Sequence, residues 1–495
     1  MGVTTGPVLE HRYADELPEL VIEWSADVPP APRLLALDEA LADELGLDPA
    51  WLHTDPGLAF LTGAAVPEDA KPVALAYAGH QFGGFSPRLG DGRALLLGEL
   101  LDPSGRRWDL HLKGSGRTPF ARGGDGKAGV GPMLREFVIA ASMHALGIPT
   151  TRSLAVVGTG EPVRRERLLP GALLARIASS HLRVGTFQYA AQLGPDHVRR
   201  LADHAIERHD PDLVGDRDGA VPDPDRYLAW FGRVVQRQAA LVAAWMSVGF
   251  VHGVMNTDNT TISGETIDYG PCAFLDRYDP AAVFSSIDEG GRYSFRNQPR
   301  IATWNLARLA EATLTLYDVD VAKDHERAVE RVTAVLQRFD AWYETARLDR
   351  FRRKLGLVSD QERDDELVDG LLHRLQMQRL DLTSTFRMLA DVLRHDGATI
   401  DGLEAWLPEW RARLALEDRP GGRVADAMDR VNPANIARNH LVEAALAAAS
   451  DHDDLAPFDR LVEVLRDPYT VRPGFERYTE PAPDDFGRYV TYCGT

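Results

Sequence analysis

The spacing of apolar residues changes along the chain, from a strand-like pattern before about residue 185 to a helical pattern after it. The apolar run 93–100, the turn-forming DPSG at 102–105 and the segment 107–114 together predict a β-hairpin. Apolar side chains alternate along the second strand, at Trp108, Leu110 and Leu112. This strand is expected to end at Lys113.

A glycine-rich segment at 114–131 leads into a predicted helix, with Pro132 near its first turn and Gly147 just past its end. The helix has an apolar stripe formed by Met133, Phe137 and Ala140. This stripe places Glu136 beside the core-facing edge, where it is able to reach Lys113 across the sheet.

Two more strands are expected at 150–158 and 171–178, after which helical periodicity dominates. The main helical segments are 227–250, 301–317, 326–348 and 440–450. We therefore predict an α+β protein in which a small β-rich lobe precedes a larger α-helical lobe. The expected divisions are an extension packed on the body at 1–70, the β-rich lobe at 71–178, the helical lobe at 179–450 and a tail at 451–495.

Composition excludes several classes of function. The 495 residues carry a formal net charge of −19, which argues against a general binder of nucleic acid or of anionic membranes. The apolar stretch 239–251 is too short to span a bilayer as a helix, and the N-terminus lacks the pattern of a secretory signal. We expect a cytoplasmic monomer.

Two short motifs in the helical half point to chemistry on nucleotides. HGVMNTDN at 252–259 is followed, nine residues after Asn259, by DYG beginning at Asp268. A protein-kinase catalytic loop has the same spacing of His and Asn before its D-F-G, but Val254 stands here where the kinase has its catalytic Asp. The motif therefore indicates either a silent kinase or an enzyme that uses ATP differently.

Five features occur in the order found in kinases. They are the glycine turn RLGDGRALL at 88–96, Lys113, Glu136, Asn259 and Asp268. Glycines allow backbone amides to approach phosphate, a Lys held by a Glu neutralises phosphate charge, and Asn with Asp supplies oxygen ligands for Mg²⁺. Each feature alone is weak evidence, but their shared order favours phosphate chemistry.

The chain resembles the selenoprotein O family of kinase-fold protein adenylyltransferases. The resemblance is carried by five blocks, 77–99, 111–137, 174–188, 249–276 and 297–310, which include GHQFGG, GGDGK, HGVMNTDN and DYGPC. It implies a protein-kinase-like two-lobed fold in which ATP binds in inverted orientation. AMP would then pass from ATP to Ser, Thr or Tyr hydroxyls of proteins. The preference for ATP over UTP stays open.

The resemblance also implies roles for individual residues. Asn259 and Asp268 would hold Mg²⁺ or Mn²⁺, and Asp258 would be the general base. Nucleotide contacts would come from Gly90, Gly92, Arg93, Lys113, Asp125, Gly126, Arg176, Arg183 and Asp268.

Physical chemistry supports parts of this assignment. Transfer of AMP expels pyrophosphate, so cations such as Arg176 and Arg183 are suited to the developing charge. With Val254 at the usual base position, another carboxylate must accept the hydroxyl proton. Asp258 is the nearest candidate and Asp276 is the alternative. Two rival functions also remain, a conventional phosphotransferase and a catalytically silent nucleotide-binding scaffold.

The chain has two cysteines, Cys272 directly after DYGP and Cys493 near the end. Cys493 stands where some family members carry selenocysteine. A disulfide between the two would tie the tail over the active-site segment and make activity depend on redox state. The alternative in a reducing cytoplasm is one buried thiol and one free thiol, and both remain open.

Overall fold

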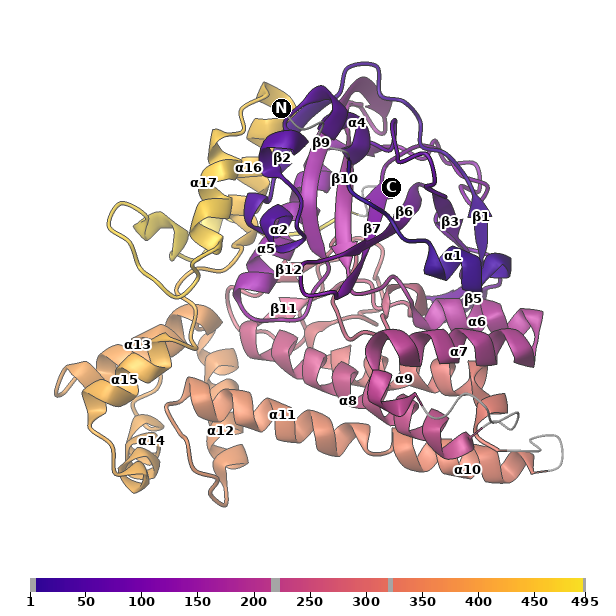
Figure 1. The fold of residues 1–495 in the computed structure, drawn as a ribbon. Helices are drawn as coiled ribbons and strands as arrows, with labels where there is room; N and C mark the ends of the chain where they lie inside the picture. The colour runs from indigo at the N-terminus through magenta and orange to yellow at the C-terminus, as the bar shows by residue number, and fades with distance from the viewer. Residues whose placement is uncertain (1–5, 215–222, 319–323, 493–495) are drawn as a thin grey trace.

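The computed structural model describes residues 6–214, 223–318 and 324–492. It combines one large antiparallel sheet with many helices, which confirms the α+β prediction (Figure 1). The sheet forms from the N-terminal part of the chain, and helices dominate after about residue 184.

The large sheet has the strand order β1-β3-β6-β7-β10-β9-β2, and β8 pairs with β10. The strands are β1 Val21–Glu23, β2 Arg33–Leu37, β3 Val73–Leu75, β6 Ala94–Leu101, β7 Arg107–Lys113, β8 Ala128–Gly129, β9 Arg152–Arg164 and β10 Leu168–Ala178. Among the described residues, two small two-stranded antiparallel sheets lie outside it. They are the hairpin of β4 Gly79–Gln81 with β5 Gly84–Ser86, and the pair of β11 Phe250–Val251 with β12 Ala273–Phe274.

The predicted hairpin is confirmed, because β6 pairs with β7 in a register that runs from Ala94 opposite Lys113 to Leu101 opposite Arg107. The two strands expected at 150–158 and 171–178 are longer than their apolar patterns suggested. They continue as a ribbon of mostly exposed residues that the hydrophobic pattern could not reveal.

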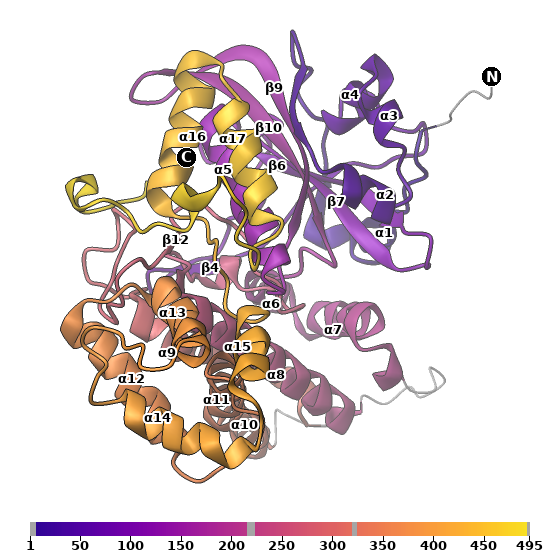
Figure 2. The same cartoon turned by 90° about the vertical axis from the view of Figure 1, so that its left-hand side faces the viewer.

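Helices cover both faces of the sheet (Figure 2). On one face α5 packs on β9 and β10, as its predicted apolar stripe requires, and the C-terminal helices α16 and α17 pack on α5. Phe458 of α17 meets Phe137 of α5 with ring centres 5.9 Å apart. The other face carries α2, α3 and α4, whose buried residues share a cluster with residues of β6, β7, β9 and β10, whereas the buried Tyr13 of α1 belongs to the cluster of α5. The bounds of all the helices on and around the sheet are α5 Val130–Ala145, α16 Asn439–His452, α17 Ala456–Leu465, α1 Arg12–Glu16, α2 Glu39–Glu44, α3 Pro49–Leu52 and α4 Asp55–Leu61.

The remaining helices form the second half of the molecule. They are α6 Val184–Leu193, α7 Pro195–His209, α8 Pro224–Val248, α9 Gln298–Ala312, α10 His325–Leu336, α11 Phe339–Lys354, α12 Asp364–Gln378, α13 Leu382–Arg394, α14 Leu407–Leu414 and α15 Gly421–Asp429. Residues of α11–α15 enclose an apolar core of their own, separate from the core that joins α5 to α8 and α9. No helix in the described ranges is long and apolar enough to cross a membrane.

One predicted helical segment proves to be two helices. The pattern at 326–348 is divided between α10 and α11 by a break at Gln337 and Arg338. Both helices pack on α8, and the break lets each turn its own buried residues toward it. Helix α8 ends at Val248 and is followed by Gly249, whose φ of 73° is left-handed and therefore suits glycine. This turn directs the chain into the HGVMNTDN loop.

Candidate active site

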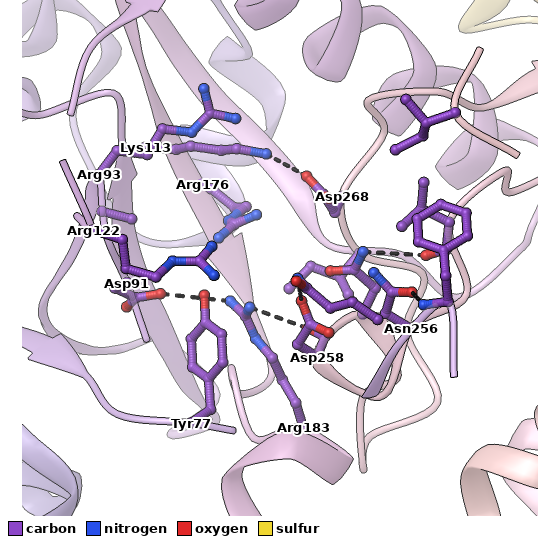
Figure 3. Close-up of a pocket in the computed structure, with 18 residues that line it drawn as sticks. Tyr77, Asp91, Arg93, Lys113, Arg122, Arg176, Arg183, Asn256, Asp258 and Asp268 are labelled. Carbon is purple, nitrogen blue, oxygen red and sulfur yellow. Dashed lines mark hydrogen bonds and ion pairs between the residues drawn. The ribbon is translucent and has the colours of Figure 1, made fainter. Parts of the chain in front are cut away.

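A cavity of about 380 Å³ lies between the large sheet and the loop that carries HGVMNTDN (Figure 3). Its lining has five cationic and three carboxylate side chains, Arg93, Lys113, Arg122, Arg176 and Arg183 against Asp91, Asp258 and Asp268. Positive charge is therefore in excess by two within a cavity that also holds carboxylate and amide oxygens. Such a cavity is chemically suited to a polyanion accompanied by a divalent cation.

Lys113 stands at the end of β7 and forms ion pairs with both Glu136 of α5 and Asp268 of the DYG segment. Lys113 and Glu136 are buried, with exposed fractions of 6% and 4%. Burial alone would raise the pKa of Asp268, but Lys113, Arg176 and Arg93 lower it well below its ordinary value. Asp268 therefore carries its charge into the cavity at neutral pH.

A buried network fixes Arg176 in the sheet. Strand pairing sets Arg176 of β10 opposite His111 of β7, and the Arg176 guanidinium donates to His111 Nδ1 at 3.1 Å. His111 Nε2 in turn donates to Asp91 Oδ2 at 2.8 Å. Burial lowers the pKa of His111, which keeps the ring neutral and consistent with one accepting and one donating nitrogen. Asp91 also accepts the Leu75 amide at 3.2 Å.

Arg183 lies between two carboxylate residues, Asp91 and Asp258 (Figure 3). Its guanidinium is 3.8 Å from Asp91 Oδ1 and donates to the backbone carbonyl of Asp258 at 3.2 Å. The same group lies over the Tyr77 ring, 4.4 Å from the ring centre. Arg183 precedes α6, whose first turn holds it beside the HGVMNTDN loop.

Asp258 lies in a short 3-10 turn, Thr257–Asn259, and lines the cavity. Its Oδ2 accepts from Gln81 Nε2 at 3.2 Å, and its Oδ1 is buried with no hydrogen-bond partner among the described residues. Burial raises the pKa of Asp258 to about 6. This value suits a carboxylate that exchanges a proton near neutral pH.

Glycine at position 79 allows the close approach of the hairpin to this carboxylate. A Cβ at Gly79 would stand only 2.7 Å from Asp258 Oδ1 and 2.9 Å from Leu89 Cδ1. Gly185 of α6 allows a second close approach, because a Cβ there would be 2.2 Å from the Ala78 carbonyl oxygen. These glycines are therefore required by packing around the loop.

The remaining residues of the loop hold its shape. His252 Nε2 donates to the Ile267 carbonyl at 3.0 Å, while its Nδ1 accepts from the Val254 amide. Asn259 donates to the Val254 carbonyl at 3.1 Å and lines the cavity together with Asp268. Val254 also lines the cavity, and in the sequence motif it stands where a kinase has its catalytic Asp.

Several residues expected at the site lie beside the cavity instead of in it. Glu136 stands behind Lys113, and Gly90 packs on Phe120, where a Cβ would be 2.4 Å from the ring. Asp125 forms an exposed ion pair with Arg165 at 2.7 Å, and neither Asp125 nor its neighbour Gly126 lines the cavity. Gly92 does line the cavity.

Asp276, the alternative base, also lies away from the cavity. Its carboxylate pairs with the fully buried guanidinium of Arg438 at 2.5 Å. Arg438 pairs in addition with Asp381 at 2.6 Å. Asp276 therefore has a structural role as the ion-pair partner of a buried guanidinium.

The C-terminal tail lies against the segment that follows DYG. Thr491 donates its hydroxyl to the Pro271 carbonyl at 2.8 Å, and Arg135 of α5 bonds both the Gly270 carbonyl and the Tyr489 hydroxyl at 3.0 Å. Cys272 is buried, and burial raises the pKa of its thiol to about 12. The suggested partner Cys493 lies outside the described residues.

Sequence reasoning missed a group of residues that line or support the cavity, namely Tyr77, Gln81, Asp91, His111, Arg122 and Asn256. Asp91 stands inside the quoted GDG turn, so its position was visible although its role was not. The part played by His111 depends on strand register, which local sequence does not reveal.

The charge of this cavity suits a nucleotide, and the similar proteins identify the class as a nucleotidyltransferase. The family model described as "Protein adenylyltransferase SelO" matches residues 8–466, and the chain belongs to the SelO family.

Similar proteins extend over the whole length. A protein of Mycolicibacterium paratuberculosis named "Protein nucleotidyltransferase YdiU" is 57% identical over 509 residues, covering 99% of each chain. One of the same name from Mycolicibacterium smegmatis is 57% identical over 504 residues and 100% of each chain. Another from Cereibacter sphaeroides is 54% identical over 495 residues, covering 98% of this chain and 99% of the relative.

Proposed function

We propose that this protein transfers AMP from ATP to Ser, Thr or Tyr hydroxyls of target proteins and releases pyrophosphate. One observation carries the proposal. The carboxylate that enters the cavity from the catalytic loop is that of Asp258, while the kinase base position is occupied by the apolar Val254. The names of the family and of its relatives agree with nucleotidyl transfer to protein.

We also propose that the architecture is a two-lobed kinase-like fold. An antiparallel sheet presents Lys113 to Glu136 of its packed helix α5, and a long helix, α8, leads into the catalytic loop. This is the order of parts found in protein kinases. The nucleotide would lie between the sheet and the loop, where the cavity is.

The acceptor hydroxyl would attack the α-phosphorus of ATP. A new oxygen–phosphorus bond forms while the bond from the α-phosphorus to its bridging oxygen breaks, and pyrophosphate leaves with that electron pair. Asp258 would accept the hydroxyl proton, a role that its cavity position and its raised pKa of about 6 support. Arg93, Lys113 and Arg176 would stabilise the charge that develops on the leaving phosphates, as inverted binding of ATP requires.

The donor set of the cavity fits a hard divalent cation, Mg²⁺ or Mn²⁺. Asn259 and Asp268 line the same cavity, and an amide oxygen with an ionised carboxylate is a donor pair that Mg²⁺ accepts, with water and phosphate completing its shell. When bound, the cation would neutralise phosphate charge. The residues of this chain would hold it opposite the arginines.

Labelled ATP distinguishes the proposal from its two rivals. Only α-phosphate label attached to protein supports adenylyl transfer, only γ-label supports a conventional kinase, and neither label supports a silent scaffold. Chelation of divalent cations should abolish labelling, as should Asp268→Ala.

Asp258→Ala tests the base. It should lower the rate about 100-fold or more and spare ATP binding, because a positioned general base contributes that much. Asp401→Ala, at an exposed position, is the matched control and should keep the wild-type rate. Full activity in Asp258→Ala would refute the assignment.

A further inference from the structure

The hairpin β4–β5 at the cavity contains a strained turn. Gln81 pairs with Gly84, so Phe82 and Gly83 alone make the turn. Their φ values are 51° and 89°, the sign that a type I′ turn requires at both central positions. Asn-Gly is the preferred pair there, and a bulky aromatic residue with positive φ is an outlier.

Polar contacts with the catalytic loop hold this turn in place. The Phe82 amide donates to Asn256 Oδ1 and to the Tyr293 hydroxyl, both at 3.1 Å. One residue earlier, Gln81 donates to Asp258, and the His80 amide donates to Thr257 Oγ1 at 2.7 Å. The hairpin is thus docked on the loop through its backbone and its polar side chains. The Phe82 ring also packs on the Tyr293 ring, with ring centres 5.0 Å apart, and the Phe85 ring packs on His80, with ring centres 4.8 Å apart.

The apolar side chains of this region remain exposed. Phe82 is 37% exposed, Phe85 48% and Ile287, from the segment after DYG, 53%. Phe82 and Ile287 line the same cavity as Asp258, and Phe85 lies outside it. We call these three residues the apolar rim. The contact with Tyr293 leaves part of the strained Phe82 side chain exposed beside Asp258, where it is able to contact a ligand.

A cation lies next to the rim. The Arg292 guanidinium is 4.7 Å from the Trp304 ring centre and 5.7 Å from that of Tyr293. A Cβ at Gly83 would be 3.8 Å from it. No carboxylate forms an ion pair with Arg292 in the part of the chain that the structure describes. The surface beside Asp258 therefore combines apolar side chains with a positive charge.

We propose that the apolar rim and Arg292 bind the acceptor protein. The occupant is an extended segment whose residue next to the modified hydroxyl is apolar and which carries an acidic side chain within reach of Arg292. The inference rests on the proposed function, because the hydroxyl must come within hydrogen-bond reach of Asp258. The residue beside that hydroxyl then lies at the rim, where aromatic anchors are typical of recognition surfaces.

A peptide library tests the proposal with defined probes. The wild-type protein is incubated with α-labelled ATP and peptides that contain one Ser, Thr or Tyr between random flanking residues. Labelled peptides should be enriched in apolar residues next to the hydroxyl and in Asp or Glu nearby. Labelling without these preferences overturns the proposal. Labelling of the enzyme itself without labelling of any peptide also overturns the proposal. If α-label appears on neither the enzyme nor a peptide, the proposed function is refuted instead.

Phe85→Ser separates acceptor binding from nucleotide binding, because Phe85 lies outside the cavity. The KM for a peptide with an apolar flank should rise about tenfold, as for an interface anchor. Binding of a fluorescent ATP analogue is measured in parallel. A loss of ATP binding as large as the rise in acceptor KM would assign the rim to the nucleotide base and overturn the proposal. Val358→Ser, equally apolar and 69% exposed, is the matched control.

Phe82→Asn tests the meaning of the strain. Asn is a preferred residue at this position of a type I′ turn. The melting temperature of the variant should therefore equal or exceed that of the wild type, while its preference for an apolar residue beside the hydroxyl is lost. A clear fall in melting temperature would show that Phe82 serves the fold and overturn its assignment to the acceptor. Arg292→Gln should remove only the preference for acidic residues, and a retained preference excludes Arg292 from the surface.

Discussion

Replacing Asp91 by Asn should destabilise the protein by about 3 kcal/mol, by removing one buried negative charge. Asp91 Oδ1 lies 3.8 Å from Arg183, a distance at which unit charges attract by about 4 kcal/mol at an effective dielectric constant of about 20. Breaking a buried pair costs about 3–5 kcal/mol. Asn still accepts hydrogen bonds from His111 and the Leu75 amide, so the lower end of that range applies.

The pH dependence of this effect has a definite sign. Burial would raise the pKa of Asp91, but His111, Arg183 and Arg176 lower it well below its ordinary value of 3.8. A carboxyl whose pKa is lower in the folded state stabilises the fold above its unfolded pKa, and loses that contribution as the pH falls through the folded pKa. The stability difference between wild type and Asp91→Asn should therefore be constant from about pH 5 to 8 and narrow below about pH 4.

Differential scanning calorimetry measures the effect. Because the entropy of unfolding grows with chain length, about 3 kcal/mol corresponds to a fall of about 3 °C in Tm. Transfer of α-label should slow about tenfold or more, since Arg176 and Arg183 lose their anchor. Asp196→Asn makes the same chemical change at a side chain that is 86% exposed and should alter stability by less than about 0.5 kcal/mol. If Asp91→Asn behaves like this control, the network does not hold the arginines.

Two further substitutions test packing and the position of the base. Arg438→Met leaves Asp276 and Asp381 without their buried cation and should lower the unfolding free energy by about 3–5 kcal/mol in urea titrations. The control Arg460→Met removes a cation from an exposed ion pair and should change the unfolding free energy by less than about 1 kcal/mol. Equal losses in the two variants would contradict the reasoning. Gly79→Ala places a methyl group against Asp258 and should slow transfer of α-label about 10- to 100-fold. Gly84→Ala in the same hairpin meets only an ordinary contact at 3.5 Å and should keep the wild-type rate. Equal rates for the two variants would contradict the assignment.

Local patterns predicted the elements that local forces determine. The β6–β7 hairpin and helices α5 and α8 formed where turn residues, apolar spacing and end signals agreed. The Lys113–Glu136 contact was also predictable, because an apolar stripe fixes which side of a helix faces the sheet.

Features that depend on distant pairing could not be predicted in the same way. His111 meets Arg176 only because β7 and β10 pair in one particular register. The addition of β1 and β2 to the two edges of the sheet likewise depends on long-range contacts. Phe82 was quoted within a motif, but its left-handed backbone is visible only in three dimensions.

The docking of α16 and α17 on α5 has a consequence for biosynthesis. The apolar side of α5 is completed by residues more than 290 positions later, such as Val442 and Phe458, so it stays uncovered while the intervening chain leaves the ribosome. Because chains emerge from the N-terminus and uncovered apolar surface favours aggregation, this interval is a hazard during synthesis. The core of the sheet half thus closes only after the residues of α16 and α17 have left the ribosome.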